Sequence, residues 1–217
     1  MSELTYEVRP ARGAPQGAIV LLHGRGADQY DLLPVIEALD PERRLAGVTP
    51  RGPLRLPPGG AHWYALGGIP TPDPDTFHAT YARLAELLDR MPEITGVPWE
   101  RTVLGGFSQG AVMSYALGLG EGRPSPAGIL PMSGFVPSVP GFALDLGSRA
   151  GLPAAIRHGS LDPVIGVEFG RRAAELLEGA GLDVQYREAP VAHGVDPRWI
   201  PELQDWLAAT VAEAART

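Results

Sequence analysis

The sequence contains no cysteine and no lysine, and these two absences exclude several kinds of chemistry. Without cysteine, the chain can form no disulfide bond, no thiolate zinc site and no cysteine nucleophile. All 18 basic residues are arginine, which excludes mechanisms that need an amine, such as a phosphate-loop lysine, a Schiff base or a serine/lysine pair. No two histidines have the spacing of a helical zinc site, so we expect neither a metal nor a cofactor.

Long apolar runs and excess positive charge are also missing. No apolar stretch approaches the roughly 18 to 20 residues that a membrane span needs. The N-terminus lacks the basic start and apolar run of a secretory signal. The formal net charge of -7 opposes binding to a polyanion. We therefore expect a cytoplasmic protein with no membrane span and no nucleic-acid partner.

The length and the pattern of apolar residues predict a single α/β domain over residues 1–217. Residues 4–8 alternate as in an edge strand, and short apolar runs typical of buried strands follow. These runs lie at residues 18–22, 45–49, 101–107, 127–132, 153–158 and 184–189. Helical spacing occurs between them, at residues 32–39, 77–88, 173–180 and 199–211. This alternation predicts a mostly parallel central sheet with helices on both faces.

The segment at residues 50–74 is the longest region without clear periodicity. It is rich in proline and glycine. Long connections in compact domains are more often functional than idle, although a plain surface loop would have the same composition.

The motif Gly-Phe-Ser-Gln-Gly at residues 106–110 carries the strongest chemical signal. A serine on a sharp strand-to-helix turn has a strained backbone, and side chains two residues away on either side would collide with the turn. Such a turn exposes the serine oxygen and aims the next backbone N–H at a developing oxyanion. Five-residue patterns arise by chance, but here the motif lies between a predicted strand and a helical run. We predict that Ser108 is a nucleophile.

A serine nucleophile needs a histidine base, and chain order selects it. In this type of site the base follows both the serine and an acid. His23, His62 and His78 precede the serine, and His158 lies inside a predicted strand with little sequence before it for an acid. His193, in a loop after the last apolar run, is the predicted base.

Asp162 is the predicted acid that orients this base. It follows the strand at residues 153–158 directly, so it should lie at the carboxyl end of the sheet, where ligands bind. Asp183 precedes a strand and belongs to the opposite end. Asp145, in an irregular region, is the reserve candidate.

The second oxyanion donor should be a backbone N–H in the loop after an early strand. Residues 23–28 fit, because two glycines let the main chain approach an ester oxygen closely. The N–H groups of Arg25 and Gln109 are then the predicted donors. We also expect a helix to begin near Asp28 and to add its positive end to the site, although Asp28 could simply cap a glycine-rich turn.

Taken together, these motifs resemble the phospholipase/carboxylesterase family of α/β-hydrolases, which includes the acyl-protein thioesterases. The resemblance runs from about residue 19 to residue 193 and rests on His-Gly-Arg-Gly-Ala-Asp at 23–28, Gly-Phe-Ser-Gln-Gly at 106–110, Ser-Gly at 133–134, His-Gly-Ser-Leu-Asp-Pro-Val at 158–164 and Ala-His-Gly at 192–194. It implies the α/β-hydrolase fold, the triad Ser108, Asp162 and His193, the oxyanion donors Arg25 and Gln109, and a homodimer.

The resemblance also suggests a substrate pocket. Trp63, Tyr64 and Leu66 would line it, although two adjacent aromatic residues could equally pack the long loop onto the core. The chain departs from the thioesterase members at Arg25, where an apolar residue is usual, and after residue 64.

The function predicted from these observations is a cofactor-free serine carboxylesterase. Its expected substrates are small-molecule esters with short to medium acyl chains, and lysophospholipids or thioesters remain open. No long apolar lid segment is evident, which argues against a true lipase. Two alternatives stay open, an acyltransferase on the same fold and a non-catalytic hydrolase-like binding protein.

Overall fold

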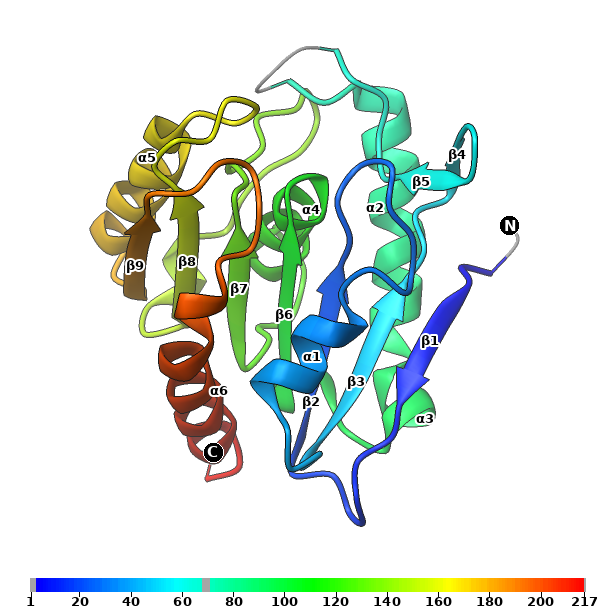
Figure 1. Ribbon diagram of the computed structural model, residues 1–217, viewed down its shortest axis with the longest axis vertical. Helices are drawn as coiled ribbons and strands as arrows, with labels where there is room; N and C mark the ends of the chain where they lie inside the picture. Colours follow the sequence, from blue (N-terminus) through cyan, green and yellow to red (C-terminus); the bar gives the residue numbers. More distant parts are fainter. Residues whose placement is uncertain (1–2, 68–70, 217) are drawn as a thin grey trace.

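The computed structural model describes residues 3–67 and 71–216 and is built around one seven-stranded sheet (Figure 1). Its strand order is β1-β3-β2-β6-β7-β8-β9. The strands are β1 (Tyr6–Arg9), β2 (Gly17–Leu22), β3 (Leu45–Pro50), β6 (Thr102–Phe107), β7 (Gly128–Met132), β8 (Pro153–Gly159) and β9 (Asp183–Ala189). Strand β1 runs antiparallel to β3 at one edge, and every other pairing is parallel. The predicted α/β class and mostly parallel sheet are confirmed.

The order of the strands indicates where a ligand would bind. From β2 the chain moves to β3 on one side, and β6 then pairs with β2 on the other side. The connections after β2 and β6 therefore leave the sheet in opposite directions, and in open α/β sheets ligands bind at the carboxyl ends of strands at such a switch point. The serine motif follows β6, and the loop at residues 23–28 follows β2.

Two helical layers cover the sheet. The helices are α1 (Leu33–Leu39), α2 (Pro74–Asp89), α3 (Met91–Thr95), α4 (Gln109–Leu119), α5 (Val167–Gly179) and α6 (Ile200–Ala214), with short 3₁₀ turns η1 (Trp99–Arg101), η2 (Gly147–Arg149) and η3 (Pro197–Trp199). Figure 1 shows α1 and α6 in front of the sheet and α2, α4 and α5 behind it.

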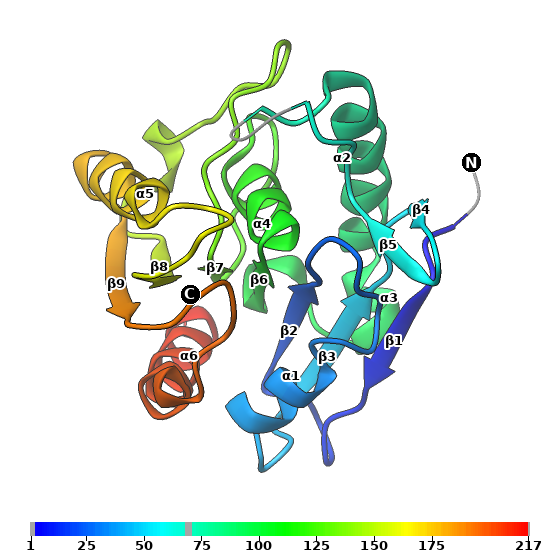
Figure 2. The same cartoon turned by 45° about the horizontal axis from the view of Figure 1, so that its top comes forward.

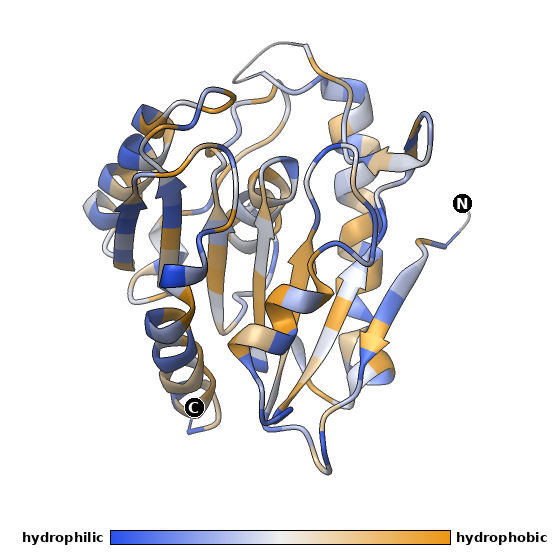
Figure 3. Ribbon diagram, viewed as in Figure 1, coloured by the Kyte–Doolittle hydropathy of each residue, from blue (hydrophilic) through white to orange (hydrophobic). Residues whose placement is uncertain are grey.

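Strand β2 shows why both faces are covered. Its six residues are all buried, with Val20 and Leu22 in the core under α2 and α4 and Ile19 and Leu21 in the core under α1 and α6. Because successive side chains of a strand point to opposite faces, a continuous apolar run needs a cover on each side. Figure 3 shows β2 mostly in the hydrophobic colour and the outer strand β9 mostly in the hydrophilic colour. None of the described helices is both long and apolar enough to cross a membrane.

The helix expected near Asp28 begins later, at Leu33, and this prediction was wrong. The Asp28 carboxylate instead accepts a hydrogen bond from the Tyr30 N–H at 3.0 Å, which closes a local turn. Pro34 then occupies the first turn of α1, where its missing N–H costs nothing.

The segment at residues 50–74 contains structure that its composition did not predict. Strands β4 (Leu54–Leu56) and β5 (Gly60–His62) form an antiparallel hairpin in it. The predicted loop is therefore partly ordered as a small second sheet, and this hairpin lies against the loop that follows β2, as described below. Residues 68–70 of the segment lie outside the described residues.

Candidate active site

Ser108 lies on a sharp turn between β6 and α4. Its backbone dihedral angles are φ 56° and ψ -118°, which few residues other than glycine adopt. The turn is held by the Ser108 N–H, which donates to the Met132 carbonyl of β7 at 2.9 Å, and by the first helical hydrogen bond, from the Val112 N–H to the Ser108 carbonyl at 3.2 Å. The side chain is thereby lifted to the carboxyl end of the sheet.

The two glycines of the motif are required by contact with β2. A Cβ atom added to Gly110 would lie 1.8 Å from the Leu22 carbonyl oxygen, and one added to Gly106 would lie 2.7 Å from the same oxygen. Real Cβ atoms do not approach backbone atoms so closely. The helix can start this near to the sheet only because both positions lack a side chain.

A line of hydrogen bonds joins the three residues that the sequence singled out. His193 Nε2 lies 2.9 Å from Ser108 Oγ, and His193 Nδ1 lies 2.6 Å from Asp162 Oδ2. The Asp162 side chain is fully buried, whereas 17% of the His193 side chain is exposed. The ring of Phe107 packs against the His193 ring, with 4.7 Å between centroids. This geometry fits a nucleophile, a base and an orienting acid.

Both oxygens of the Asp162 carboxylate are hydrogen-bonded. Its Oδ1 accepts the N–H groups of Val164 at 2.8 Å and Ile165 at 2.9 Å, which leaves Oδ2 for the histidine. His158, the histidine that the sequence placed in a strand, is fully buried beneath this loop. Its Nε2 lies 2.8 Å from the Ile165 carbonyl oxygen, so it anchors the same turn.

The loops that carry Asp162 and His193 are also joined through their backbones. The Ser160 N–H donates to the Ala189 carbonyl at 2.7 Å, and the Leu161 N–H donates to the Val191 carbonyl at 3.1 Å. At Gly159 a side chain would collide with this second loop, since its Cβ would lie 2.5 Å from the Val191 carbonyl oxygen. The distance between acid and base is therefore set by β8 and β9, which pair along their length.

Both predicted oxyanion donors lie beside Ser108. Gly24 packs so closely that its Cβ would be 3.5 Å from the Ser108 Cβ, and Arg25 follows it. The Arg25 N–H has no acceptor among the described residues. Gln109 is the first residue of α4, and the first N–H groups of a helix have no partner within it.

The hairpin of β4 and β5 holds the loop that contains Arg25. The Gly26 N–H donates to the Ala61 carbonyl, and the Ala61 N–H donates to the Ala27 carbonyl, each at 2.8 Å. The loop thus pairs with β5 like an added strand. Figure 2, in which this end of the sheet comes forward, shows the loop after β2 beside β5.

The Gln109 side chain makes a second connection, which sequence reasoning missed. Its Oε1 accepts the Trp63 N–H at 3.1 Å, and its Nε2 donates to the Tyr64 carbonyl at 3.0 Å. A primary amide presents a donor and an acceptor side by side, and so matches a main-chain N–H and C=O together. The residue after the serine therefore ties the segment at 50–74 to the turn. Its place inside the motif was the signal that could have revealed it.

His23 is a further residue whose role the sequence did not reveal. The Gly52 N–H donates to its Nε2 at 2.9 Å, so Nδ1 carries the proton and donates to the Gly24 carbonyl at 2.7 Å. The Trp63 indole N–H donates to the His23 carbonyl at 2.7 Å. Burial lowers the pKa of His23 below its usual value, which favours this neutral form. His23 thus joins three segments beside Arg25.

The three residues predicted to line a pocket fall into two groups. Trp63 is fully buried and Tyr64 nearly so, and both belong to the core cluster under α2. Leu66 is 54% exposed. The buried pair packs the long segment onto the core, which is the alternative weighed for adjacent aromatic residues. Contact of these side chains with a substrate stays a prediction. Of the three, only Leu66 is exposed enough to touch a substrate without a rearrangement.

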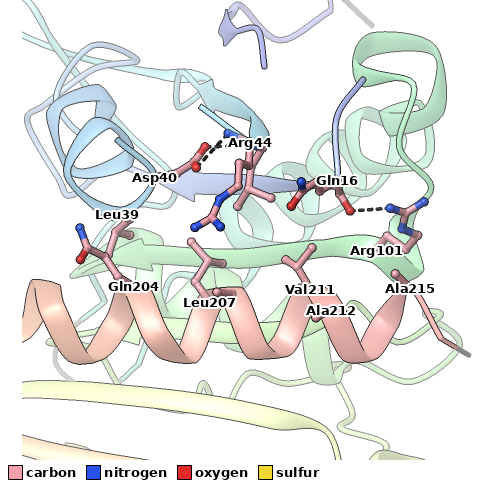
Figure 4. A pocket seen from close by; sticks show the side chains of 12 residues that line it. Gln16, Leu39, Asp40, Arg44, Arg101, Gln204, Leu207, Val211, Ala212 and Ala215 are labelled. Atoms are coloured by element: carbon pink, nitrogen blue, oxygen red, sulfur yellow. Dashed lines mark hydrogen bonds between the residues drawn. The ribbon is translucent and has the colours of Figure 1, made fainter. Parts of the chain in front are cut away.

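A separate pocket of about 360 Å³ lies between α6 and the start of β3 (Figure 4). Leu207 and Val211 of α6 point into it from one side, and Arg44 and Gln16 lie on the other. Gln16 and Arg44 directly precede β2 and β3, so the pocket lies at the amino ends of these strands, opposite to Ser108. This pocket is therefore not part of the candidate active site.

Comparison with known proteins assigns the family. The model of the Phospholipase/Carboxylesterase family matches residues 4–211. The chain belongs to this family. The resemblance stated from the motifs is thereby confirmed, and membership makes the chain a hydrolase of the ester or thioester class.

Individual relatives agree with the family. The chain is 26% identical to acyl-protein thioesterase 1 of Debaryomyces hansenii, over 95% of this chain and 97% of that protein. Its fold is similar to that of a carboxylesterase from Mesorhizobium loti, with a TM-score of 0.82, 21% identity and 94% of each chain covered. It is also similar to acyl-protein thioesterase 2 of Zea mays, with a TM-score of 0.75, 24% identity and coverage of 95% of this chain and 99% of that one. These likenesses confirm the α/β-hydrolase fold.

Proposed function

We propose that the chain is a serine carboxylesterase that works through an acyl-enzyme on Ser108, with His193 as base and Asp162 as orienting acid. The observation that carries this proposal is the unbroken line of hydrogen bonds from Ser108 Oγ through the imidazole to the buried carboxylate, 2.9 Å and 2.6 Å long. No cofactor is required, since the three side chains supply both the nucleophile and the proton transfer.

In the first half of the reaction, Ser108 Oγ attacks the acyl carbon while its proton moves to His193 Nε2. The carbonyl oxygen becomes an oxyanion, which the N–H groups of Arg25 and Gln109 stabilise as hydrogen-bond donors. The imidazolium is stabilised by the Asp162 carboxylate at Nδ1. When the tetrahedral intermediate collapses, His193 gives the proton to the leaving alcohol, and the acyl group stays on Ser108 as an ester.

In the second half, water repeats the same steps. His193 Nε2 takes a proton from a water molecule, and the resulting hydroxide attacks the acyl carbon. The acid is released, and Oγ regains its proton from the imidazolium. The exposed part of the His193 side chain gives water a path to the base.

An apolar pocket with a volume of about 680 Å³ is a candidate site for the acyl group. It is lined by Phe135, Leu144, Phe169 and Leu176, and by none of the three triad residues. Its connection to the turn of Ser108 is Phe135, which follows Gly134, whose Cβ position lies 3.3 Å from the Ser108 carbonyl oxygen. An apolar pocket of this volume would accept acyl chains of short to medium length.

Thioesters are a second candidate class of substrate. The Debaryomyces hansenii relative, named as an acyl-protein thioesterase, aligns with nearly the whole chain and favours this class. The same attack on Ser108 serves both classes, since only the leaving atom changes from oxygen to sulfur.

The test is a matched series of p-nitrophenyl esters and acyl-thioesters with acyl chains of two to twelve carbons, assayed with the wild type and with Ser108→Ala. We expect the wild type to hydrolyse short and medium chains best and the Ser108→Ala variant to lose activity on every substrate. Full activity of this variant on p-nitrophenyl butyrate would overturn the proposal. A product ester formed in the presence of an alcohol, in place of the free acid, would instead indicate an acyltransferase.

A further inference from the structure

The side chain of Arg25 has no role in the mechanism so far, although its backbone lies beside the nucleophile. It is exposed, and its guanidinium group makes no hydrogen bond or ion pair in the part of the chain that the structure describes. The two arginines of the segment at residues 50–74 differ in this respect. Arg51 donates to Gln29 Oε1 at 3.2 Å and to the Gly59 carbonyl at 2.8 Å, whereas the guanidinium of Arg55, like that of Arg25, has no partner among the described residues.

The backbone on both sides of Arg25 is fixed. Before it, the Gly24 carbonyl accepts the hydrogen bond from His23, and after it the Gly26 N–H is paired with Ala61. The Arg25 side chain therefore starts from a fixed backbone position directly after Gly24, which packs on Ser108. A substrate bound at Ser108 thus lies within reach of its guanidinium.

The acid nearest to Arg25 along the chain is already engaged. Asp28 Oδ1 accepts the Tyr30 N–H at 3.0 Å, and Asp28 Oδ2 lies 3.5 Å from Arg51. The charge of Arg25 is thus not neutralised by this carboxylate. The chain as a whole has a net charge of -7. An unpaired cation next to the site therefore does not reflect a general excess of positive charge.

We propose that Arg25 is a specificity-determining residue that selects esters and thioesters carrying a carboxylate near the scissile bond. The planar guanidinium donates two parallel hydrogen bonds to a carboxylate, which a neutral group of the same shape accepts only in part. This inference rests on the proposed function and adds to it the charge of the preferred substrate. The carboxylate can belong to the acyl part or to the leaving alcohol, because both pass the mouth of the site.

Two pairs of substrates distinguish these positions. For the acyl part, monomethyl succinate is compared with methyl succinamate, and for the leaving group, 4-carboxyphenyl butyrate is compared with 4-carbamoylphenyl butyrate. Within each pair only a carboxylate is exchanged for a carboxamide, so the ratio of the two kcat/KM values measures the preference for charge. Release of acid or phenol is followed for the wild type and for the Arg25→Leu, Arg25→Lys and Arg12→Leu variants.

Arg12→Leu is the matched control. Arg12 is also exposed and without a partner for its guanidinium in the described residues, but it lies between β1 and β2 at the opposite end of the sheet (Figure 1). The Arg12→Leu variant removes the same charge from the protein as Arg25→Leu does. Any effect of net charge alone would therefore appear in both variants.

We expect Arg25→Leu to lower the carboxylate-to-carboxamide ratio by about tenfold or more in at least one pair, equivalent to about 1.4 kcal/mol. Arg25→Lys should keep part of the preference, and Arg12→Leu should keep all of it. An equal ratio in the wild type and Arg25→Leu for both pairs would overturn the inference, and so would an equal fall in Arg12→Leu. Activity that survives Ser108→Ala would point to failure of the proposed function itself.

Discussion

The Gln109 side chain offers a way to disturb the oxyanion site without touching the triad. Changing Gln109 to Leu keeps its backbone N–H but leaves the buried Trp63 N–H without its acceptor at 3.1 Å. The Tyr64 carbonyl loses the amide donor at 3.0 Å but keeps His62 Nδ1, which lies 3.2 Å from it. An unsatisfied buried backbone group costs about 1 to 3 kcal/mol, so the variant should lose roughly this much of the roughly 5 to 15 kcal/mol of unfolding free energy typical of a domain.

The effect on catalysis should appear mainly in kcat. Release of Trp63 loosens the segment that holds Arg25, and loss of one oxyanion donor costs about 10²- to 10³-fold in kcat. Because this donor is displaced and not removed, we expect a smaller fall, of roughly 10- to 100-fold, with little change in KM. Urea unfolding and ester hydrolysis by the same preparation measure both effects.

The Gln109→Glu variant separates the amide's role from simple packing. Its size is the same, but a carboxylate would face the Tyr64 carbonyl, and it could donate a hydrogen bond there only when protonated. The unfolding free energy of Gln109→Glu should therefore approach that of the wild type as the pH falls. If Gln109→Leu had the unfolding midpoint and the kcat of the wild type, this reasoning would be refuted. The Gln109 amide would then not be what holds Trp63 and Tyr64 in place.

Three further predictions follow from single contacts. Changing Asp162 to Asn should lower kcat roughly 10⁴-fold with a normal fold, since the histidine loses its orienting anion; a fall of less than tenfold in steady-state assays would contradict this role. Burial lowers the pKa of His23, so as the pH falls below about 6.5 the unfolded chain takes up a proton that the folded chain does not. Unfolding free energy should then decrease from pH 7 to pH 5, less steeply in His23→Asn; equal slopes in urea titrations would argue against it. Gly110→Ala should prevent soluble expression because its Cβ would lie 1.8 Å from the Leu22 carbonyl, whereas Gly59→Ala, with nothing within 4 Å, should be tolerated.

The central strands β2, β3, β6, β7 and β8 were predictable because their residues are buried on both faces. All seven predicted strands occur, and the alternating segment at residues 4–8 overlaps the edge strand β1. Chain order and the parallel topology were also enough to single out Asp162 and His193, which lie next to each other and next to Ser108. Residues that follow parallel strands meet at one edge of the sheet, so local pattern carries this long-range information.

Contacts made by single side chains across the fold were not predictable. The hairpin of β4 and β5 lies in a proline- and glycine-rich segment without periodicity, and its partner is the distant loop at residues 24–27. The roles of His23 and of the Gln109 amide depend on which backbone groups come within about 3 Å, which no spacing in the sequence encodes. The start of α1 was misplaced because Asp28 closes a turn of its own before the helix begins.

The most direct test of the account is to find which residue carries the covalent intermediate. A fluorophosphonate probe, which reacts with an activated serine, is added to the wild type and to the Ser108→Ala and His193→Ala variants. The adduct is then mapped by peptide mass spectrometry. We predict stoichiometric labelling of Ser108 in the wild type and little or none in either variant. Unchanged labelling of Ser108→Ala, or a wild type that hydrolyses p-nitrophenyl butyrate but is labelled at another residue, would contradict the account.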